Sequence, residues 1–529
     1  MNKKWNVKFD GRDMELGNIL TEIIKERHID DLSEFICDIS YNRIIDYEKL
    51  HNINKAYEII SKGVADNKNF LVYADVDVDG VTSGAIMYRY LKHLTDNVKI
   101  TINNGKKHGV SDFAIPSPVP DIVIVVDSIH ENKEYDKFVN QDIQVVVFDH
   151  HLIPKSIDTN SDNPLIISSA DNYDNPELSG AGVTWKFCKY YDYMALDYFA
   201  DDLVDLATCG IIADMSSMRS IENRNICYQG IRNVKNVGIK ALIGGTYFNA
   251  RTVSFSIAPL VNACQRMNKN SLPLKVFISD DAEYIKTIIK EMKIAKDMQN
   301  EVVDNLMPMV LEQVDKYKGK KICSIVISTE YGVSGLIANK IMELVQKPVL
   351  ILQKTKQSYS GSARGIGVES FKYYCENTGL ANCAGHDNAF GIEISIDNYD
   401  KFLDLIEKEL SDVEFENVID IDMQLNPEQI TENLIENLYA FDKLSGKDFP
   451  PIRVCIKDFT DYELGSFKNK GHLKLENENF LAIKWNFNKE TAVFDGRPID
   501  VTGTLQRGTI GRTCYNQLII DDFKIGSSE

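Results

Sequence analysis

Three short apolar runs, each ending in aspartate, constrain the fold of this chain more than any other feature. They are NFLVYAD at residues 69–75, DIVIVVD at 121–127 and IQVVVFD at 143–149, and the last continues into His150 and His151. Short apolar runs that alternate with amphipathic stretches indicate βαβ units and a mainly parallel sheet. Ligands of such sheets bind outside the carboxyl ends of the strands, so we predict a cluster of acids and histidines there. One such Asp is commonly a turn or helix cap. Three in one domain favour a functional site.

The rest of the pattern divides the chain into further parts. We predict an N-terminal helical segment at 1–50, a mainly parallel α/β domain at 51–270, a connector helix at 271–318, a smaller α/β domain at 319–415, and a β-barrel resembling an OB-fold at 416–529. The helical segments are predicted from apolar spacing and the barrel from short alternating runs such as IRVCIKDF and HLKLE. The fold class is therefore α/β with an appended β domain.

Composition narrows the class of protein and its compartment. Lys and Arg number 59 against 78 Asp and Glu, and the net charge of -19 argues against a generally basic protein that coats DNA. A local basic groove remains compatible with this charge. The 10 cysteines form no CxxC pair, which fits reduced thiols better than a zinc knuckle or a disulfide framework. The N-terminus lacks the apolar segment of a signal peptide, and no apolar run reaches the ~20 residues of a membrane span. We therefore expect a cytoplasmic protein.

The first acidic strand end carries two further acids, in YADVDVDG. If the strand extends through Asp75, side-chain alternation puts Asp75, Asp77 and Asp79 on one side, and Thr82 or Ser83 can cap the following helix. The alternatives are a solvated acidic turn or a calcium loop, but no Glu stands at the EF-hand's twelfth position. Clustered Asp and His without thiolates suit Mn²⁺ and Mg²⁺. Two such ions roughly 3.5–4 Å apart can orient a water and stabilise a leaving oxygen. The residues alone predict a two-metal phosphoesterase.

The order of these motifs resembles a known superfamily. ADVDVDG, an isolated Asp, the DHH triplet at 149–151 and a later Asp resemble the DHH phosphoesterases, and GSARGIGVESF followed by CAGHDNAFG resembles their DHHA1 domain. From about residue 50 to VTGTLQ near the C-terminus, the chain is similar to RecJ-type exonucleases with an OB-fold. The resemblance implies a single-strand-specific DNA exonuclease that works 5′→3′ with two Mn²⁺ or Mg²⁺ ions and releases 5′-mononucleotides. It also implies a role in DNA repair, recombination or replication.

The resemblance assigns roles to the residues of the acidic cluster. The positions that match the family's metal ligands are Asp77, Asp79, Asp127, His150 and Asp214. Asp127 would bridge the two ions, and His151 would complete the catalytic set, either by facing the scissile phosphate or by supporting the metal ligands. Asp149 would orient the histidines from behind the ligands, and Asp75 would support the pair that follows it. Tyr73 stands where related pyrophosphatases have a histidine ligand, so we expect one metal to bind weakly.

Substrate phosphates need groups of their own, because an acidic centre repels them. Three residues match family positions near the substrate backbone or its 5′ end: Arg266, Arg364 and His386. Asn262 and Ser362 are candidate hydrogen-bond donors beside them. A guanidinium group suits the fork-like geometry of a phosphate. The alternative for either arginine is a surface or interdomain salt bridge, and for His386 it is a structural role.

The predicted barrel offers its own contacts to DNA. OB-folds bind single strands with a basic groove and stacking aromatic side chains. Our candidates are Lys474, Trp485 and Arg507, with Lys470, His472, Phe487 and Arg512 beside them. Aromatic residues of a small barrel are also core residues, so Trp485 and Phe487 keep both interpretations.

Two other functions remain open from the sequence. A DHH–DHHA1 oligoribonuclease or cyclic-dinucleotide phosphodiesterase would share the metal centre, but the additional barrel argues against it. A non-catalytic, Cdc45-like DNA-binding replication factor would have lost metal ligands, whereas the predicted set is complete here. The expected partners are single-stranded DNA and a helicase or single-strand-binding protein that supplies it. We expect a monomer of bacterial or phage origin.

Overall fold

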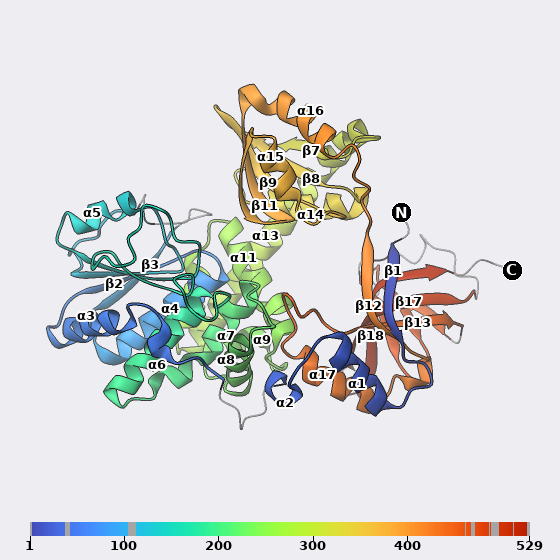
Figure 1. The fold of residues 1–529 in the computed structure, drawn as a ribbon, viewed down its shortest axis with the longest axis horizontal. Coiled ribbons are helices and arrows are strands. Elements are labelled where there is room, and N and C mark those ends of the chain that lie inside the picture. The colour runs from blue at the N-terminus through green and yellow to red at the C-terminus, as the bar shows by residue number, and fades with distance from the viewer. Residues whose placement is uncertain are drawn as a thin grey trace.

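The computed structural model describes most of the chain. The described residues are 3–36, 43–103, 110, 113–460, 462–466, 471–485, 487, 497–510 and 513–525. They form a first α/β domain, a smaller second α/β domain and a C-terminal β domain, with a long helix between the two α/β domains (Figure 1). The predicted fold class is confirmed. Lys470 and Arg512, two candidates for DNA contacts, lie outside the described residues.

A parallel sheet forms the centre of the first α/β domain. Its order is β3 (Val98–Ile102), β2 (Phe70–Ala74), β4 (Ile122–Val126), β5 (Gln144–Asp149) and β6 (Leu165–Ser168), with every neighbouring pair parallel. Strands β2, β4 and β5 are buried along nearly their whole length, as expected where both faces of a parallel sheet are covered. These three strands are the predicted ones, and they are neighbours. Asp75, Asp127 and Asp149 therefore stand at the same edge of the sheet.

Helices of the first domain pack around this sheet. Helices α4 (Val78–Leu94), α6 (Gly180–Ala195) and α7 (Val204–Ala213) contact one another beside it. The other helices are α3 (Ile53–Ala65), α5 (Asp136–Val139), α8 (Ile221–Arg232), α9 (Val237–Ile243), α10 (Ala250–Thr252) and α11 (Ala258–Arg266). Short helical turns are η1 (Tyr47–Lys49), η2 (Asn132–Glu134), η3 (Phe199–Leu203) and the π-helical η4 (Val253–Ile257).

The predicted connector is two helices rather than one. Helix α12 (Ser271–Ile278) ends before α13 (Ala282–Val314), whose first turn is capped by the Asp281 carboxylate, which accepts hydrogen bonds from two backbone N–H groups. Helix α13 is 33 residues long, packs against α11 and α12 at one end and reaches β7 of the second domain at the other. Figure 1 shows it rising from the first domain to the second.

The second α/β domain has a mixed sheet. Its order is β10 (Ala381–His386), β11 (Ala389–Ser395), β9 (Ser358–Arg364), β8 (Val349–Lys354) and β7 (Cys323–Ile327), and of these pairs β7 with β8 is parallel. Helix α14 (Ser334–Val345) packs on β8 and β9. Helices α15 (Phe371–Asn377) and α16 (Tyr399–Glu409) share a core with the opposite face of the sheet. The turns η5 (Asp315–Tyr317) and η6 (Ile396–Asn398) connect these elements.

Eight strands form the sheet of the C-terminal domain. They lie in the order β1 (Lys4–Asp10), β12 (Val418–Gln424), β13 (Arg453–Phe459), β17 (Ile499–Ile510), β18 (Thr513–Ile525), β16 (Leu481–Lys484), β15 (Leu473–Glu476) and β14 (Glu463–Ser466). Helices α1 (Leu16–Glu26) and α17 (Glu432–Asp442) lie beside it in Figure 1, and η7 (Pro427–Gln429) precedes α17.

The prediction of a helical N-terminal segment is wrong at its start. Residues Lys4–Asp10 form strand β1, which pairs in parallel with β12 of the C-terminal domain. Its side chains alternate between exposed and half-buried, as the alternating Trp5, Val7 and Phe9 allow. The helical part of the prediction holds for α1 and the short α2 (Leu32–Phe35). Among the described residues, we find no helix both long and apolar enough to cross a membrane.

Candidate metal centre

The acids of the first loop reach the centre from a helix start and not from an extended strand. Strand β2 ends at Ala74, and Asp77 is the N-cap of α4, where its side chain accepts a hydrogen bond from Gly80 N at 3.0 Å. Asp79 lies in the first turn of α4. The expected strand-like alternation is therefore wrong, and so is the expected cap by Thr82 or Ser83, which lie inside the helix. The short side chain of Asp outcompetes them because it stands directly before the first turn.

Asp79 is held at the start of a second helix. It accepts hydrogen bonds from Ser179 Oγ at 2.9 Å, Gly180 N at 2.7 Å and Ala181 N at 3.0 Å. These groups form the N-terminus of α6, where backbone N–H groups point outward and favour a negative charge. These three hydrogen bonds hold the carboxylate in place and compensate for its burial, since Asp79 is only 2% exposed. We did not predict Ser179, but a Ser directly before the GAG of LSGAGVTW is a helix-cap signal.

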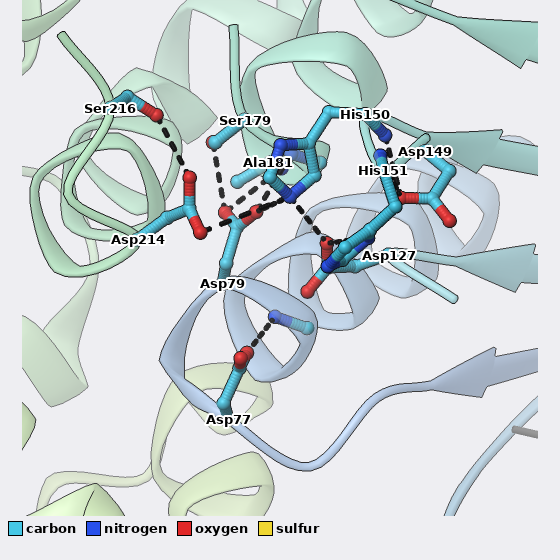
Figure 2. A network of polar contacts seen from close by, with 12 residues as sticks. Asp77, Asp79, Asp127, Asp149, His150, His151, Ser179, Ala181, Asp214 and Ser216 are labelled. Atoms are coloured by element: carbon cyan, nitrogen blue, oxygen red, sulfur yellow. Dashed lines mark hydrogen bonds and ion pairs between the residues drawn. The ribbon is translucent and has the colours of Figure 1, made fainter. Parts of the chain in front are cut away.

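Four side chains converge at the carboxyl edge of the sheet (Figure 2). His150 Nε2 lies 3.3 Å from Asp127 Oδ1, 3.8 Å from Asp79 Oδ2 and 3.9 Å from Asp214 Oδ1. Asp127 follows β4, His150 follows β5, and Asp214 is the C-cap of α7, where Ser216 Oγ donates to its carboxylate at 3.0 Å. Residues far apart in the sequence are therefore brought within reach of one ion.

Glycine leaves room for this convergence. A Cβ atom at Gly180 would lie 2.6 Å from Asp127 Oδ1, and one at Gly210 would collide with the Asp79 carboxylate. Both glycines are inside buried helices that pack directly on the acids. A larger residue at either position would move the ligands apart.

The donor set fits divalent cations. Three overlapping groups have ligand atoms that all lie within 4.8 Å of one another: Asp127 with Asp149, His150 and His151; Asp79 with His150 and Asp214; and Asp75 with Asp77 and Asp127. Carboxylates and imidazoles without thiolates suit hard or borderline ions. Asp127 Oδ1 and His150 Nε2 are buried, and neither has a hydrogen-bond partner among the described residues. Buried polar atoms normally have a partner, so a cation is the natural one here.

Electrostatics support the same conclusion. Burial raises the pKa of Asp127 well above its ordinary value, and the neighbouring Asp79 and Asp77 carboxylates add to the rise. Burial is also the main cause of the raised pKa of Asp79, and it raises the pKa of Asp214 to about 7 with the help of the Asp79 charge. Several carboxylates this close repel one another, and a bound cation relieves that repulsion.

Asp149 has a different environment and orients the histidines. It is fully buried and accepts hydrogen bonds from His151 Nδ1 at 2.7 Å, from the backbone N–H groups of His150 and His151, and from Ile129 N. Burial alone would raise its pKa, but these donors hold it at about 2. The hydrogen bond to Asp149 raises the pKa of His151 to about 9. Of the three acids at the strand ends, Asp149 therefore holds the histidines in position, and Asp75 and Asp127 face the centre.

All the residues predicted for the centre lie in this cluster. Asp75 lies in one group with Asp77 and Asp127, close enough to offer a ligand atom itself, whereas we expected it only to support the pair that follows it. Tyr73 is fully buried in β2 and packs on Phe113 with ring centroids 5.6 Å apart.

The predicted phosphate-binding residues lie on both sides of the boundary between the α/β domains. Asn262 and Arg266 are half-buried on α11, and Arg266 Nη1 donates to Gln299 Oε1 of α13 at 3.2 Å. Ser362 and Arg364 are on β9, and with residues of β10 and β11 they line a cavity of about 660 Å³. Their hydrogen-bond partners are neutral: Ser334 Oγ for Ser362 at 2.9 Å, and Asn339 Oδ1 for Arg364 at 2.8 Å. The alternative of an interdomain salt bridge finds no support among the described residues.

His386 lies at the far end of the same sheet. It is the last residue of β10 and pairs with Ala389, which in turn pairs with Arg364. This register puts His386 and Arg364 on one face. The side chain is exposed, and the structure does not bring it into contact with the acidic cluster among the described residues.

The candidates in the C-terminal domain separate into three kinds. Trp485 is 40% exposed and meets His472 edge-on at 4.9 Å. Phe487 packs edge-on against Phe523 at 5.2 Å, as a core residue does. Arg507 forms an ion pair with Glu432 Oε1 at 2.8 Å, and Lys474 forms one with Glu476. Trp485 is therefore an exposed aromatic candidate, whereas the two basic candidates, Lys474 and Arg507, already pair with carboxylates.

Comparisons with known proteins agree with this geometry. Residues 69–211 match the model of the DHH family, N-terminal domain, and residues 421–522 match that of the RecJ OB domain. A putative SPbeta prophage-derived single-strand DNA-specific exonuclease, YorK of Bacillus subtilis, is 26% identical over 94% of this chain and 93% of its own length. The single-stranded-DNA-specific exonuclease RecJ of the same organism is 24% identical over 90% of this chain, which spans 63% of that longer protein.

Solved structures show the same fold. The crystal structure of RecJ from Thermus thermophilus in complex with Mn²⁺ covers 99% of this chain and 80% of its own, with a TM-score of 0.79 and 19% identity. The same protein in complex with Mg²⁺ gives a TM-score of 0.75. The chain therefore matches the DHH family model at 69–211 and the RecJ OB model at 421–522, and over nearly its whole length it is similar to RecJ-like proteins of the DHH superfamily.

Proposed function

We propose that this chain is a metal-dependent exonuclease that degrades single-stranded DNA from the 5′ end and releases 5′-mononucleotides. The observation that carries the proposal is the buried cluster of Asp79, Asp127, His150 and Asp214, in which Asp127 Oδ1 and His150 Nε2 have no hydrogen-bond partner among the described residues. The names of the relatives support single-stranded DNA as the substrate. The direction follows from the resemblance to RecJ-type enzymes.

The proposed chemistry uses the cluster as a two-cation centre. When bound, two divalent cations lower the pKa of a water molecule and neutralise charge on the phosphate. Asp77, Asp79, Asp127, His150 and Asp214 would hold them, with Asp127 shared. Asp149 accepts a hydrogen bond from His151 Nδ1, which leaves the Nε2 atom of His151 as the one that would face the scissile phosphate. Because its pKa is raised to about 9, His151 would be protonated near neutral pH and would donate to a phosphate oxygen.

The proposed path of the strand runs over both α/β domains and the C-terminal domain. Asn262, Arg266, Ser362, Arg364 and His386 would bind phosphates or the sugar beside them. Trp485 would stack on a base farther along the strand. Lys474 and Arg507 are proposed only as secondary contacts, since Glu476 and Glu432 already pair with them.

The proposed domain limits are 51–270, 319–415 and 416–529, with 271–318 as the connector. A helicase or a single-strand-binding protein would supply the substrate during repair, recombination or replication, and the chain would act as a monomer. Since the proposed substrate is DNA, the proposed site of action is the cytoplasm.

The direct test compares strands that differ at one end. A single strand with a 5′-phosphate and a 3′ label is incubated with the protein and Mn²⁺, beside a strand blocked at its 5′ end and a blunt duplex. We expect shortening of the free single strand alone, and none in chelator. Shortening of the 5′-blocked strand would contradict the direction, and shortening of the duplex would contradict the specificity.

A further inference from the structure

Two cysteines face each other between α15 and β10 of the second α/β domain. Cys375 lies near the end of α15, and Cys383 is the third residue of β10. The helix packs on this strand, and Cys383 packs against the apolar core to which Cys375 belongs. The Cys375 thiol donates a hydrogen bond to the Cys383 sulfur. The two sulfur atoms are therefore close enough to react with each other.

Hydrogen bonds one helical turn earlier fix this arrangement. Lys372 stands three residues before Cys375 and so lies on the same face of α15. Its Nζ donates to Gly385 O at 3.1 Å, and its backbone N–H donates to Asp387 O at 2.9 Å. Gly385 comes two residues after Cys383 along β10. The contact of Lys372 with Gly385 and the contact of the two cysteines therefore lie side by side between the helix and the strand.

The two thiols have different environments. Cys375 is fully buried, whereas Cys383 is half-buried and borders the cavity of about 660 Å³ in this domain. The hydrogen bond from Cys375 lowers the pKa of Cys383, and the charge of Lys372 lowers it as well. Burial raises the pKa of Cys375, and the same hydrogen bond adds to the rise. Cys383 is therefore the thiol that ionises and meets solutes, and Cys375 is the one that keeps its proton.

The other cysteines whose burial the structure describes lie inside apolar cores. They are Cys188, Cys209, Cys227, Cys264, Cys323 and Cys455. Burial raises the pKa of Cys323, for example, to about 11. A thiol that reacts with oxidants is accessible, ionises easily and often stands beside a second cysteine. Within the described part of the chain, Cys383 combines these three properties.

We propose that Cys375 and Cys383 form a redox modification site, at which a hydroperoxide converts the two thiols into a disulfide within the chain. The Cys383 thiolate attacks the peroxide, so an S–O bond forms, the O–O bond breaks, and the leaving oxygen takes up a proton. The Cys375 sulfur then attacks the Cys383 sulfur. An S–S bond forms, the S–O bond breaks, and hydroxide leaves as water with the proton of Cys375. The two sulfurs are oxidised and the peroxide is reduced.

The disulfide would clamp α15 to the turn that carries His386. His386 is the last residue of β10, three residues after Cys383. This turn is already bound to the start of α15, because Phe371 N donates to Asn388 Oδ1 at 3.0 Å. A covalent bond between the same helix and strand restricts the turn further. The inference goes beyond the proposed function and does not depend on it.

Peptide mapping tests whether the bond forms. The reduced full chain is treated with hydrogen peroxide in chelator, which excludes metal-catalysed oxidation, then alkylated with iodoacetamide and digested with trypsin. Both cysteines fall in the tryptic peptide 373–401, because no Lys or Arg lies inside it before its last residue. We expect this peptide to become lighter by about 2 Da and to take up no alkyl group until it is reduced. A peptide 373–401 that is alkylated at both cysteines after peroxide treatment would overturn the inference.

A second cleavage locates the bond. Glu376 lies between the two cysteines, so a protease that cleaves after Glu should divide the oxidised peptide into two fragments that stay joined until reduction. Fragments that separate without reduction would overturn the inference. The wild-type chain alone decides this test, so it does not depend on whether a variant folds.

Variants assign the two roles. Cys375→Ala should stop at the sulfenic acid of Cys383, which dimedone labels, and Cys383→Ala should leave Cys375 unoxidised. Cys323→Ala is the matched control, since Cys323 is a fully buried thiol of the same domain, and it should form the disulfide as wild type does. Dimedone labelling of Cys375 in Cys383→Ala, with none of Cys383 in Cys375→Ala, would contradict the assigned roles.

Amide hydrogen exchange measures the clamp. Exchange at residues 384–388 should be slower in the oxidised chain than in the reduced chain, and dithiothreitol should restore the faster rate. Equal rates in the two forms would contradict a clamp on the turn of His386.

Discussion

His150 Nε2 lies 3.3 Å from Asp127 Oδ1, although the two residues follow different strands of the sheet. Parallel pairing of β4 with β5 brings them together, since Val126 is in register with Phe148. The contact is buried, and neither atom has a hydrogen-bond partner among the described residues. The same pairing that buries the apolar strands therefore builds a site whose polar atoms need a cation.

Asp127→Asn should abolish turnover and leave the fold intact. The amide keeps the shape, and Asn tolerates the backbone φ of 57° at this position. In chelator, the variant should unfold at a higher temperature than wild type, because burial and the Asp79 and Asp77 charges already oppose ionisation of Asp127. Calorimetric unfolding with and without Mn²⁺ measures this. A variant less stable than wild type in chelator would contradict the assigned repulsion.

Mn²⁺ should stabilise the wild-type chain. A ligand at about 100 times its dissociation constant adds about 2.7 kcal/mol to the free energy of unfolding. The added stability should decline as the pH falls through the pKa of Asp214, which is about 7, because a cation binds the ionised carboxylate. Unfolding temperatures at a series of pH values, with Mn²⁺ and with chelator, measure the difference. A gain from Mn²⁺ that is independent of pH would exclude Asp214 as a ligand.

The pair of Asp149 and His151 should give stability its own pH dependence in chelator. The pKa of Asp149 is about 2, below its ordinary 3.8, so its contribution is present above 3.8 and is lost as the pH falls toward 2. The pKa of His151 is about 9, above its ordinary 6.5, so its contribution is complete below 6.5 and is lost as the pH rises through 9. Between 6.5 and 9, the unfolding temperature of His151→Asn should therefore fall less than that of wild type. If the unfolding temperatures of both proteins fell equally between these pH values, the pairing of Asp149 with His151 would be refuted.

Ser179→Ala should weaken metal binding by about 10- to 100-fold, as loss of groups that orient ligands does elsewhere. Its hydroxyl caps α6 and donates to Asp79 at 2.9 Å, so the change should also cost about 1 kcal/mol of stability. Thr431→Ala is the control, since Thr431 caps α17 in the C-terminal domain. It should lose comparable stability and bind Mn²⁺ as wild type does. Isothermal titration of both variants with Mn²⁺ provides the comparison, and equal affinities would argue against a role for Ser179.

Trp485→Ala should lower affinity for a long single strand and not for a very short one. Stacking of one base on an aromatic ring contributes about 1–3 kcal/mol. Phe487→Ala should instead lower the unfolding temperature, because Phe487 packs against Phe523. Anisotropy titrations in chelator with a long and a short oligomer separate the two effects. If Trp485→Ala bound both oligomers as wild type does, the C-terminal domain would need another contact surface.

Local patterns predicted the strands and the cluster of acids and histidines at their carboxyl ends, because a continuous apolar run and the acid that ends it are adjacent in the sequence. Asp127, Asp149 and His150 were placed correctly for this reason. The alternation expected for Asp75, Asp77 and Asp79 failed because a helix begins at Val78, and period-two spacing looks the same in a short loop. Several residues near the start of this helix can act as its cap, so the sequence did not determine at which residue the helix begins.

The remaining features depend on contacts between distant residues. Strand β1 is stable only against β12, and nothing near Lys4–Asp10 indicates a partner so far along the chain. Ser179 and Gly210 matter because of what α6 and α7 touch, not because of their neighbours in sequence.

The most direct measurement follows a 5′-phosphorylated, 3′-labelled single strand over time with wild type and Asp127→Asn, after each is shown to be folded. On addition of Mn²⁺, we predict progressive shortening with release of 5′-mononucleotides by wild type and an intact strand with the variant. An intact strand with wild type while Mn²⁺ is bound, or equal cleavage by both proteins, would contradict a metal-dependent exonuclease built around Asp127.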